Sequence, residues 1–253
     1  MSKLNELFEI YPGDASATMP LGVRANDLVY AGGLAGTDPV TGAPTGDLLA
    51  QTETALKHLA AAVEGAGGST DNIGRAVAFV TRAEDRMAVY DPWDAMFPDA
   101  NDRPAFKVLV ADLPPGQLVR IDGLAILGAR RMRGEIPGVS ARDPSVRLGD
   151  WLFTSRVHGI HPEDGVPSDV RTEAVQNFEN LSDLLDIHGF EPSDMVQITI
   201  FGNDSTYFEI ARQACEQVFL AVGGDPAIEC VASPLAPKFK ISAEMIAVKG
   251  GAP

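Results

Sequence analysis

The sequence predicts an α+β fold made of two tandem units, each a mixed β-sheet with two helices packed on one face. The first supporting observation is an internal duplication. Residues 24–39, RANDLVYAGGLAGTDP, match residues 147–162, RLGDWLFTSRVHGIHP, at an offset of 123, and farther along an offset of 122 pairs Leu59 with Leu181. The second is that apolar residues recur with helical spacing in some segments and form short β-prone runs in others. A repeat of about 120 residues is long enough to bury its own hydrophobic core.

Each copy is expected to show the same order of elements. An apolar strand comes first, and a loop rich in Gly, Pro and Asp separates it from an amphipathic helix that ends near a glycine. The pattern per copy is β-α-β-α-β-β, with room for an additional hairpin at the start. The expected ranges in copy one are 27–34, 48–65, 75–81, 87–97, 105–110 and 118–127, and those in copy two are 150–157, 170–188, 195–202, 207–222, 227–232 and 239–248.

The expected domains are residues 1–130 and 134–253. Between them lies the segment RRMRGEIPG, residues 130–138, which is basic and ends in Pro and Gly. Such a composition is typical of a connection between domains, so we interpret this segment as a linker.

Composition and charge narrow the classes of function. The 253 residues are 45% hydrophobic and 22% charged, with a net charge of −15, so phosphate backbones and anionic membranes are poor partners. No apolar run approaches the length of a membrane span, and the N-terminus lacks a hydrophobic signal core. The two cysteines fit a reducing cytoplasm, and the four histidines lack the spacing of a zinc site. We therefore expect a cytoplasmic protein with no metal and no cofactor.

Three segments resemble the Rid family, also called YjgF/YER057c/UK114, in tandem form. They are DLVYAGGLAGTDPVTG at 27–42, RPAF at 103–106 and LPPGQLVRIDGLAI at 113–126. The resemblance implies chorismate-mutase-like α+β units that form trimers with ligand clefts between subunits. It also implies hydrolysis of enamines and imines to ketones and ammonia, as in the 2-aminomuconate deaminases of aromatic compound degradation. Some members are labelled ribonucleases, a role that the acidic charge disfavours.

The carboxylate-binding groups of that family are changed in both copies. The arginine that ends the family's RPAR motif is replaced by Phe106 in copy one and by Ile228 in copy two. The family's aromatic residue near its N-terminus falls on Met19 and on Arg142. If the substrate is a carboxylate, another arginine must bind it.

Of the two acidic residues that the family has in its closing strand, each copy keeps one. The first of the two glutamates in the family's EIE motif is Arg120 in copy one and Ser242 in copy two, whereas the second survives as Asp122 and Glu244. Each surviving acid is a candidate to position water, and is equally compatible with a structural hydrogen-bond partner for a backbone N–H or an arginine.

The substrate-binding candidates are Arg156, Arg142, Arg120 and Gly33. Arg156 stands where the family has glycine at the cleft edge, and Arg120 stands in place of an acid. The alternative for each arginine is a solvated or salt-bridged surface residue. Gly33, with Gly32, allows close approach of a ligand to the backbone, and is equally compatible with a simple strand-end bulge.

The catalytic candidates are His158, Glu244 and Cys230. His158 follows Arg156 by two residues, so the two side chains share one face of the strand end, and a pKa near ~6.5 makes it a credible proton donor. Cys230 falls where many Rid proteins have cysteine, although a small buried hydrophobe is the favoured alternative. Glu229 beside it is expected to point to the opposite face.

Together these residues predict a cofactor-independent deaminase that hydrolyses an enamine or imine C–N bond of a small carboxylate metabolite to a 2-oxo acid and ammonia. Because polar candidates concentrate in copy two, its cleft is expected to carry the chemistry. Loss of the RPAR arginine from both copies favours an alternative, a non-catalytic ligand-binding or assembly protein. A hydrolase or lyase of another class is a third alternative. A homotrimer of two-domain chains is expected.

Overall fold

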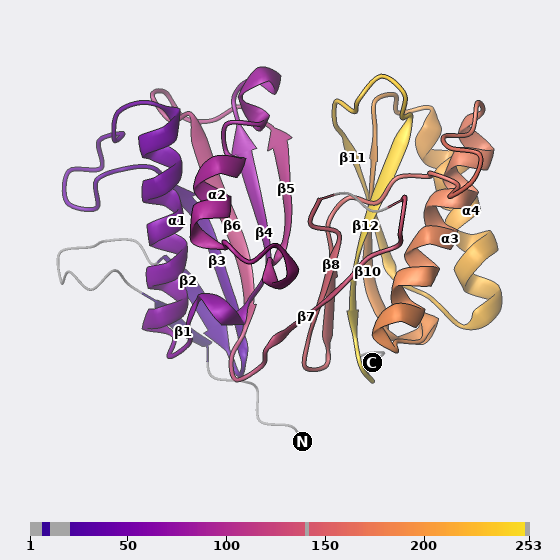
Figure 1. The fold of residues 1–253 in the computed structure, drawn as a ribbon, viewed down its shortest axis with the longest axis horizontal. Coiled ribbons are helices and arrows are strands. Elements are labelled where there is room, and N and C mark those ends of the chain that lie inside the picture. Colours follow the sequence, from indigo (N-terminus) through magenta and orange to yellow (C-terminus); the bar gives the residue numbers. More distant parts are fainter. Residues whose placement is uncertain (1–6, 11–20, 140–141, 251–253) are drawn as a thin grey trace. The chain divides into compact units, whose positions relative to one another are not determined.

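The computed structural model describes residues 7–10, 21–139 and 142–250, and the chain separates into two compact units, Met1–Arg131 and Met132–Pro253 (Figure 1). Each unit has one six-stranded mixed sheet, and its two α-helices pack on one face of that sheet. The predicted α+β fold of two tandem units is therefore confirmed. Among the described residues, no helix combines the length and the apolar character needed to cross a membrane.

The first unit has the sheet order β1-β2-β3-β6-β4-β5, in which only β4 and β5 run parallel. Two α-helices and three short 3₁₀ turns connect these strands. The elements are β1 Leu7–Ile10, β2 Gly22–Ala25, β3 Leu28–Ala35, α1 Leu48–Gly65, η1 Thr70–Asn72, β4 Ile73–Val80, η2 Ala83–Arg86, α2 Tyr90–Met96, η3 Ala100–Asp102, β5 Ala105–Val110 and β6 Val119–Ile126.

The second unit repeats this plan with the order β11-β10-β12-β9-β8-β7, and its parallel pair is β10 with β11. The predicted linker is partly wrong, since residues 131–134 form the edge strand β7 of the second sheet. The elements are β7 Arg131–Gly134, β8 Ser145–Leu148, β9 Trp151–Thr154, α3 Val170–His188, η4 Pro192–Asp194, β10 Met195–Gly202, α4 Tyr207–Phe219, η5 Leu220–Val222, β11 Ala227–Ala232 and β12 Ile241–Val248.

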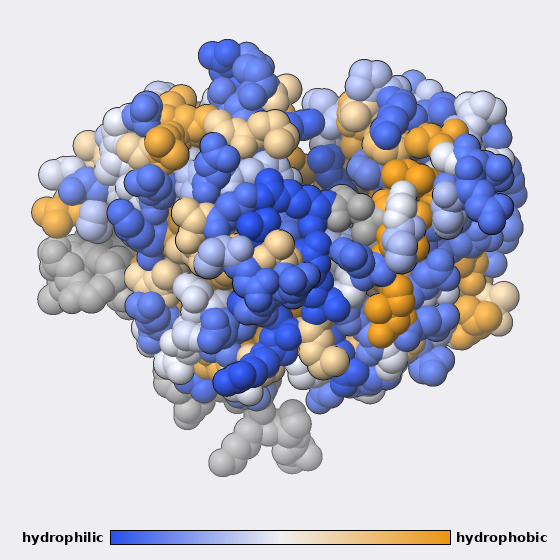
Figure 2. All heavy atoms as spheres, viewed as in Figure 1, coloured by the Kyte–Doolittle hydropathy of each residue, from blue (hydrophilic) through white to orange (hydrophobic). Residues whose placement is uncertain are grey.

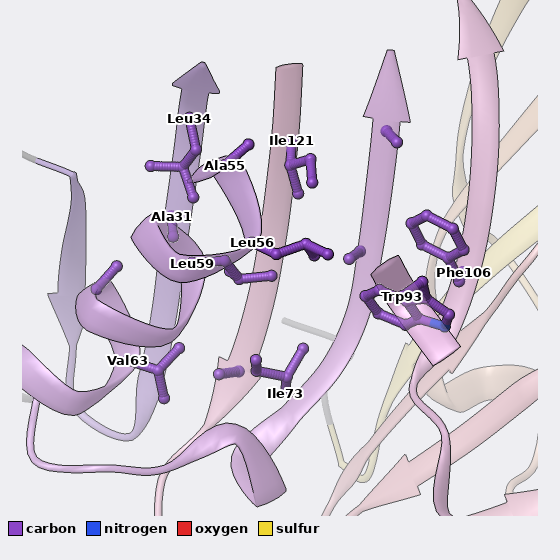
Figure 3. Close-up of a cluster of buried hydrophobic side chains, with 14 of the residues drawn as sticks. Ala31, Leu34, Ala55, Leu56, Leu59, Val63, Ile73, Trp93, Phe106 and Ile121 are labelled. Atoms are coloured by element: carbon purple, nitrogen blue, oxygen red, sulfur yellow. The ribbon is translucent and has the colours of Figure 1, made fainter. Parts of the chain in front are cut away.

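Helix α1 shows why these segments fold as they do. Its N-terminus is capped by the Asp47 carboxylate, which accepts a hydrogen bond from the Ala50 N–H at 3.0 Å. Leu56, Leu59 and Val63 form its buried stripe and pack toward the sheet (Figure 3). Each such side chain stabilises the fold by roughly 1.5–3 kcal/mol through burial of apolar surface. The other face of the sheet carries no helix, and we call it the helix-free face.

Both sheets contain a β-bulge at the same point. In the first, the pairing of β3 with β6 shifts by one residue between Ala31 and Leu34. In the second, Phe153 pairs with Ile246, whereas Val157 forms an isolated bridge with Ala243, which is the same one-residue shift. The strand predicted over 150–157 therefore ends early, at Thr154, and the bulge re-aims the side chains that follow it beside β12.

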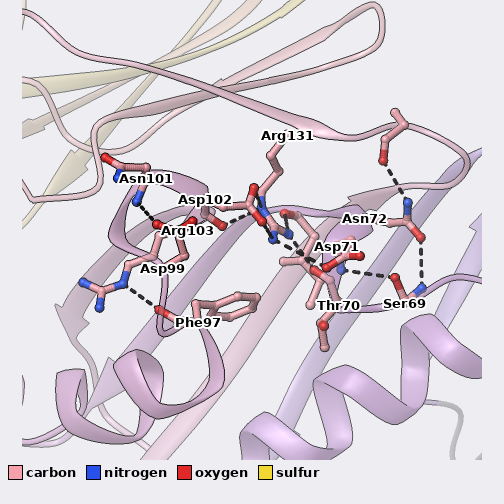
Figure 4. Close-up of polar contacts among 12 residues, drawn as sticks. Ser69, Thr70, Asp71, Asn72, Phe97, Asp99, Asn101, Asp102, Arg103 and Arg131 are labelled. Atoms are coloured by element: carbon pink, nitrogen blue, oxygen red, sulfur yellow. Dashed lines mark hydrogen bonds and ion pairs between the residues drawn. The ribbon is translucent and has the colours of Figure 1, made fainter.

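Arg131, within the predicted linker, contacts several residues of the first unit (Figure 4). Its side chain is 3% exposed, donates hydrogen bonds to the carbonyls of Thr70 (2.6 Å) and Ile73 (3.2 Å), and pairs with Asp102 at 2.8 Å. Its guanidinium also lies 5.4 Å from the centre of the Phe97 ring.

We expect Arg131→Ala to lower the free energy of unfolding by about 1.5–3 kcal/mol, because it removes charge-assisted hydrogen bonds from a buried position. Urea unfolding followed by fluorescence measures this loss. Arg131→Lys keeps the charge without the planar fork and should recover only part of the stability. An unfolding midpoint unchanged in Arg131→Ala would show that the contacts contribute nothing.

Candidate active site

In the second unit, polar side chains gather on the helix-free face of the sheet. The alternate residues of β12, from Ile241 to Ala247, belong to the core beneath α3 and α4, so Glu244 points to the opposite face. Glu244 pairs with Thr199 of β10, which in turn pairs with Glu229 of β11. Two carboxylates and a hydroxyl therefore lie in one row across three strands. Glu244 is 3% exposed.

Arg156 lies on the same face as Glu244. Its guanidinium carbon is 5.6 Å from the centre of the Phe201 ring, and Phe201 pairs with Ser242, next but one to Glu244 on β12. The hydrogen-bonded bridge of Val157 with Ala243 places residues 156 and 244 opposite each other in the backbone register. The bulge thus brings a guanidinium, an aromatic ring and a carboxylate to neighbouring positions.

His158 lies beside this group, and its protonation differs from the sequence-based expectation. Its ring stacks on Phe239 at 3.8 Å. Burial, and next the charge of Arg156, lower the pKa of His158 to about 4. The imidazole is therefore neutral at pH 7, whereas the sequence-based expectation was a pKa near ~6.5. The buried Nδ1 has no hydrogen-bond partner among the described residues, so it offers an acceptor to water or ligand.

Cys230 does not join this group. The side chains of Ile228 and Cys230 pack against the core beneath the helices, whereas Glu229 receives a long hydrogen bond, 3.5 Å, from Gln197 Nε2 on the other side. The predicted alternation along this strand is confirmed. Because Cys230 and Glu244 lie on opposite faces of one sheet, they cannot act on the same substrate atom from this arrangement. The alternative interpretation of Cys230, a small hydrophobe, agrees better with its packing.

The first unit brings together Gly33, Arg120 and Asp122. The Gly33 N–H donates a hydrogen bond to Asp122 Oδ1 at 2.6 Å, and Arg120 Nε lies 3.9 Å from the same oxygen. The pKa of Tyr30 is raised, first by burial and next by the negative charge of Asp122. Tyr30 was not a sequence-based candidate. Its signal was its place three residues before Gly33 on the strand that pairs with β6.

Arg142 has a different setting from the other predicted arginines. It is exposed, outside any strand, and its backbone carbonyl accepts a hydrogen bond from Arg133 Nη2 at 2.5 Å. Met19, the other residue at the family's aromatic position, lies outside the described residues. Of the predicted binding residues, the structure therefore places Arg120 beside Gly33 and Arg156 beside His158.

The two positions of the lost family arginine have different surroundings. Phe106 is buried, stacks on Trp93 at 4.0 Å with nearly parallel rings, and meets the edge of Tyr90 (Figure 3 shows Phe106 beside Trp93). Ile228 is half-buried on the edge strand β11. In copy one the position of the family arginine is part of a buried aromatic cluster, whereas in copy two it is partly exposed to solvent.

Hydrophilic residues dominate the face drawn in Figure 2, and the net charge of the chain is −15. An acidic surface opposes the approach of polyanions such as RNA. A small ligand can still bind, because it interacts with the local charges of the two side-chain groups rather than with the whole surface.

Comparison with known proteins gives a consistent result. The model of the family described as "Endoribonuclease L-PSP" matches residues 14–127 and again residues 141–249. The chain is 33% identical over 107 residues to the 2-iminobutanoate/2-iminopropanoate deaminase of Escherichia coli K12, which covers 41% of this chain and 84% of that protein. It is 32% identical over 109 residues to a RutC family protein of Pasteurella multocida, covering 42% and 84%. Among solved structures, the YjgF gene product of E. coli is 26% identical with a TM-score of 0.40, covering 44% and 90%.

Proposed function

Because the chain belongs to the Endoribonuclease L-PSP family, which matches it twice, we propose that it hydrolyses the C–N bond of a small imine that bears a carboxylate. The observation that carries this proposal is the meeting of Arg156, Glu244 and a neutral His158 at one bulge of the second sheet. The similarity to an imine deaminase supports the same reaction. The name of the family refers to RNA cleavage, which the net charge of −15 disfavours.

The proposed mechanism needs few groups. Arg156 binds the substrate carboxylate through its planar fork and fixes the imine carbon over the sheet. A water that donates hydrogen bonds to Glu244 or to His158 Nδ1 attacks that carbon, and a proton passes to the imine nitrogen. The resulting carbinolamine then collapses, so that the C–N bond breaks, ammonia leaves and a 2-oxo acid remains. An enamine substrate enters the same path after protonation at carbon.

The finer proposal is a 2-aminomuconate-like substrate of aromatic compound degradation, which rests on the family resemblance alone. The decisive experiment is an ammonia-release assay with two substrate sets. One contains 2-iminopropanoate and 2-iminobutanoate, generated in place from amino acids by an oxidase, and the other contains 2-aminomuconate. Faster ammonia release than in buffer, lost in Glu244→Gln, supports deamination. The preferred set then decides the finer proposal.

A non-catalytic ligand-binding protein is the second candidate. The observation in its favour is that the arginine position of copy one is filled by an aromatic stack and that of copy two by Ile228. Saturable binding of these compounds, or of their 2-oxo acid products, with no acceleration of ammonia release would establish that alternative.

We also propose a homotrimer of two-domain chains in the cytoplasm. Each sheet has helices on one face only and ends in edge strands, β1 and β5 in the first and β7 and β11 in the second. Edge strands and uncovered sheet faces favour association with another copy. Sedimentation equilibrium should give a mass near three times 26.8 kDa. A stable monomer at micromolar concentration would contradict the proposal.

A further inference from the structure

We propose that Asn177, a buried asparagine of helix α3, is a positioning residue for the candidate site of the second unit. It does not touch the substrate. From the helix side of the sheet, its amide holds the backbone between Arg156 and His158, and it thereby fixes where these two side chains lie. This inference rests on the function proposed above, because it assigns a further residue to the same reaction.

The contact reaches the backbone at the bulge of the second sheet. Asn177 Nδ2 donates a buried hydrogen bond to the Val157 carbonyl at 2.6 Å. The same carbonyl accepts the Ala243 N–H at 3.0 Å, and the Val157 N–H donates to the Ala243 carbonyl at 2.7 Å. Asn177 therefore adds a third hydrogen bond to the bridge that sets Arg156 opposite Glu244 in the backbone register.

Val157 is a residue through which a buried amide can act on both of its neighbours. Its side chain is 5% exposed and belongs to the core beneath α3 and α4, within reach of the helix. Its carbonyl shares one rigid peptide plane with the N–H of His158. Holding that carbonyl by two donors therefore restricts the backbone that leads into His158, and the bridge restricts the backbone that follows Arg156.

A second contact from the same helix belongs to the shared fold. Asn180 Nδ2 donates to the His158 carbonyl at 2.8 Å. In the first unit the equivalent carbonyl is that of Ala35, and its oxygen lies 3.1 Å from Nδ1 of His58, the residue that matches Asn180 at the offset of 122. Both copies thus hold this carbonyl from the helix, whether or not an arginine and a histidine flank the bulge.

Asn177, in contrast, marks a difference between the copies. Its counterpart in the first unit is Ala55, a buried residue with no side-chain donor. Asn177 is itself 0% exposed, and its Oδ1 has no hydrogen-bond partner in the described part of the chain. Burying an unpaired amide oxygen costs stability. That an asparagine nevertheless lies beneath the bulge of copy two, and only there, indicates that it positions the candidate site.

The test begins with Asn177→Leu, because leucine has nearly the same shape and a higher helix propensity. The variant removes the unpaired oxygen, and the Val157 carbonyl keeps its hydrogen bond from Ala243. Replacing a polar group without leaving a buried partner unpaired is nearly neutral or stabilising. We therefore expect a urea unfolding midpoint equal to or above that of the wild type.

The positioning role is measured on His158 and on the reaction. In Asn177→Leu the His158 ring should titrate, by NMR, above the wild-type pKa of about 4, because a less restrained loop admits water to the ring. The charges of Arg156 and Lys238, which also lower this pKa, are unchanged in the variant. In the ammonia-release assay kcat/KM should fall about tenfold or more, since small misplacements of binding groups are costly to rate.

Two variants of the same helix are the controls. Glu179→Gln changes an exposed residue of α3 and should alter none of the three measurements. Leu184→Ala opens a cavity at a residue that is 0% exposed, so it should lower the urea midpoint and leave the pKa of His158 near 4. This pair separates positioning from general loosening of the unit. Asn177→Ala, which introduces the residue of copy one, replaces the leucine variant if that variant does not fold.

Three outcomes would overturn the inference. They are a pKa of His158 that stays near 4 when Asn177 is replaced, an equal rise of that pKa in Leu184→Ala, and an unchanged kcat/KM despite a raised pKa. If the wild-type protein releases no ammonia, the proposed deaminase fails in its own assay. The NMR titration would then still decide whether Asn177 holds the backbone beside His158.

Discussion

Arg156→Ala should lower kcat/KM for carboxylate-bearing imines by roughly 30-fold to about 4,000-fold while the protein stays folded. Removing one partner of a charge-assisted, bidentate pair typically costs about 2–5 kcal/mol, and about 1.4 kcal/mol corresponds to a tenfold change in rate. The structural loss should be small, because Arg156 is half-buried and lies just beyond the end of strand β9 rather than in the core beneath the helices. Steady-state kinetics on the ammonia-release assay measures the change.

Companion variants make this experiment specific. Arg156→Lys should recover only part of the activity, because an ammonium cannot form the fork. Arg171→Ala, which changes an exposed arginine of the same unit, is the matched control. Arg156→Ala should also raise the pKa of His158, which burial and then the Arg156 charge hold near 4, and NMR titration of the ring measures this shift. Near-normal turnover in Arg156→Ala would transfer the role to Arg142 or Arg120, and near-normal turnover in all three would eliminate the carboxylate clamp.

Restoring the family arginine should destabilise copy one far more than copy two. Phe106→Arg replaces a ring that is 3% exposed and stacked on Trp93 at 4.0 Å. Losing a buried phenylalanine typically costs 3–5 kcal/mol, and the arginine would add a buried charge without a designed partner. We therefore expect a loss of at least about 4 kcal/mol, a large share of the roughly 5–15 kcal/mol by which an ordinary domain is stable. Urea unfolding measures the loss.

Ile228→Arg is the matched comparison, because Ile228 occupies the equivalent position on the edge strand of the other sheet and is half-buried. Its long side chain can place the charge in water while the stem covers the core. A loss of about 1–2 kcal/mol is expected, in the ordinary range for a partly buried substitution. Equal losses in the two variants would show that the aromatic stack does not determine which copy could regain the arginine.

Much of the fold could be predicted because its signals are local. The stripe of Leu56 and Leu59 and the alternation of Cys230 with Glu229 each depend on residues a few positions apart, and the structure confirms both. The linker interpretation is wrong only for residues 131–134, and for a physical reason. The basic segment around Arg131 has the composition of a connection, but pairing with β8 makes a strand of it and buried carbonyls hold its arginine.

For the candidate sites, residue identity alone predicted less than it did for the fold. The sequence by itself established the duplication, the loss of the RPAR arginine from both copies and the family resemblance, since these are comparisons of residue identity. Only the tertiary structure decided that Gly33 and Asp122, 89 residues apart, share a hydrogen bond, and that Cys230 and Glu244 lie on opposite faces. It also decided that His158 is neutral, because its pKa depends on burial and on a neighbouring charge. The partner of a given polar side chain and the depth of its burial arise from contacts between distant segments, which the local pattern of a single sequence does not specify.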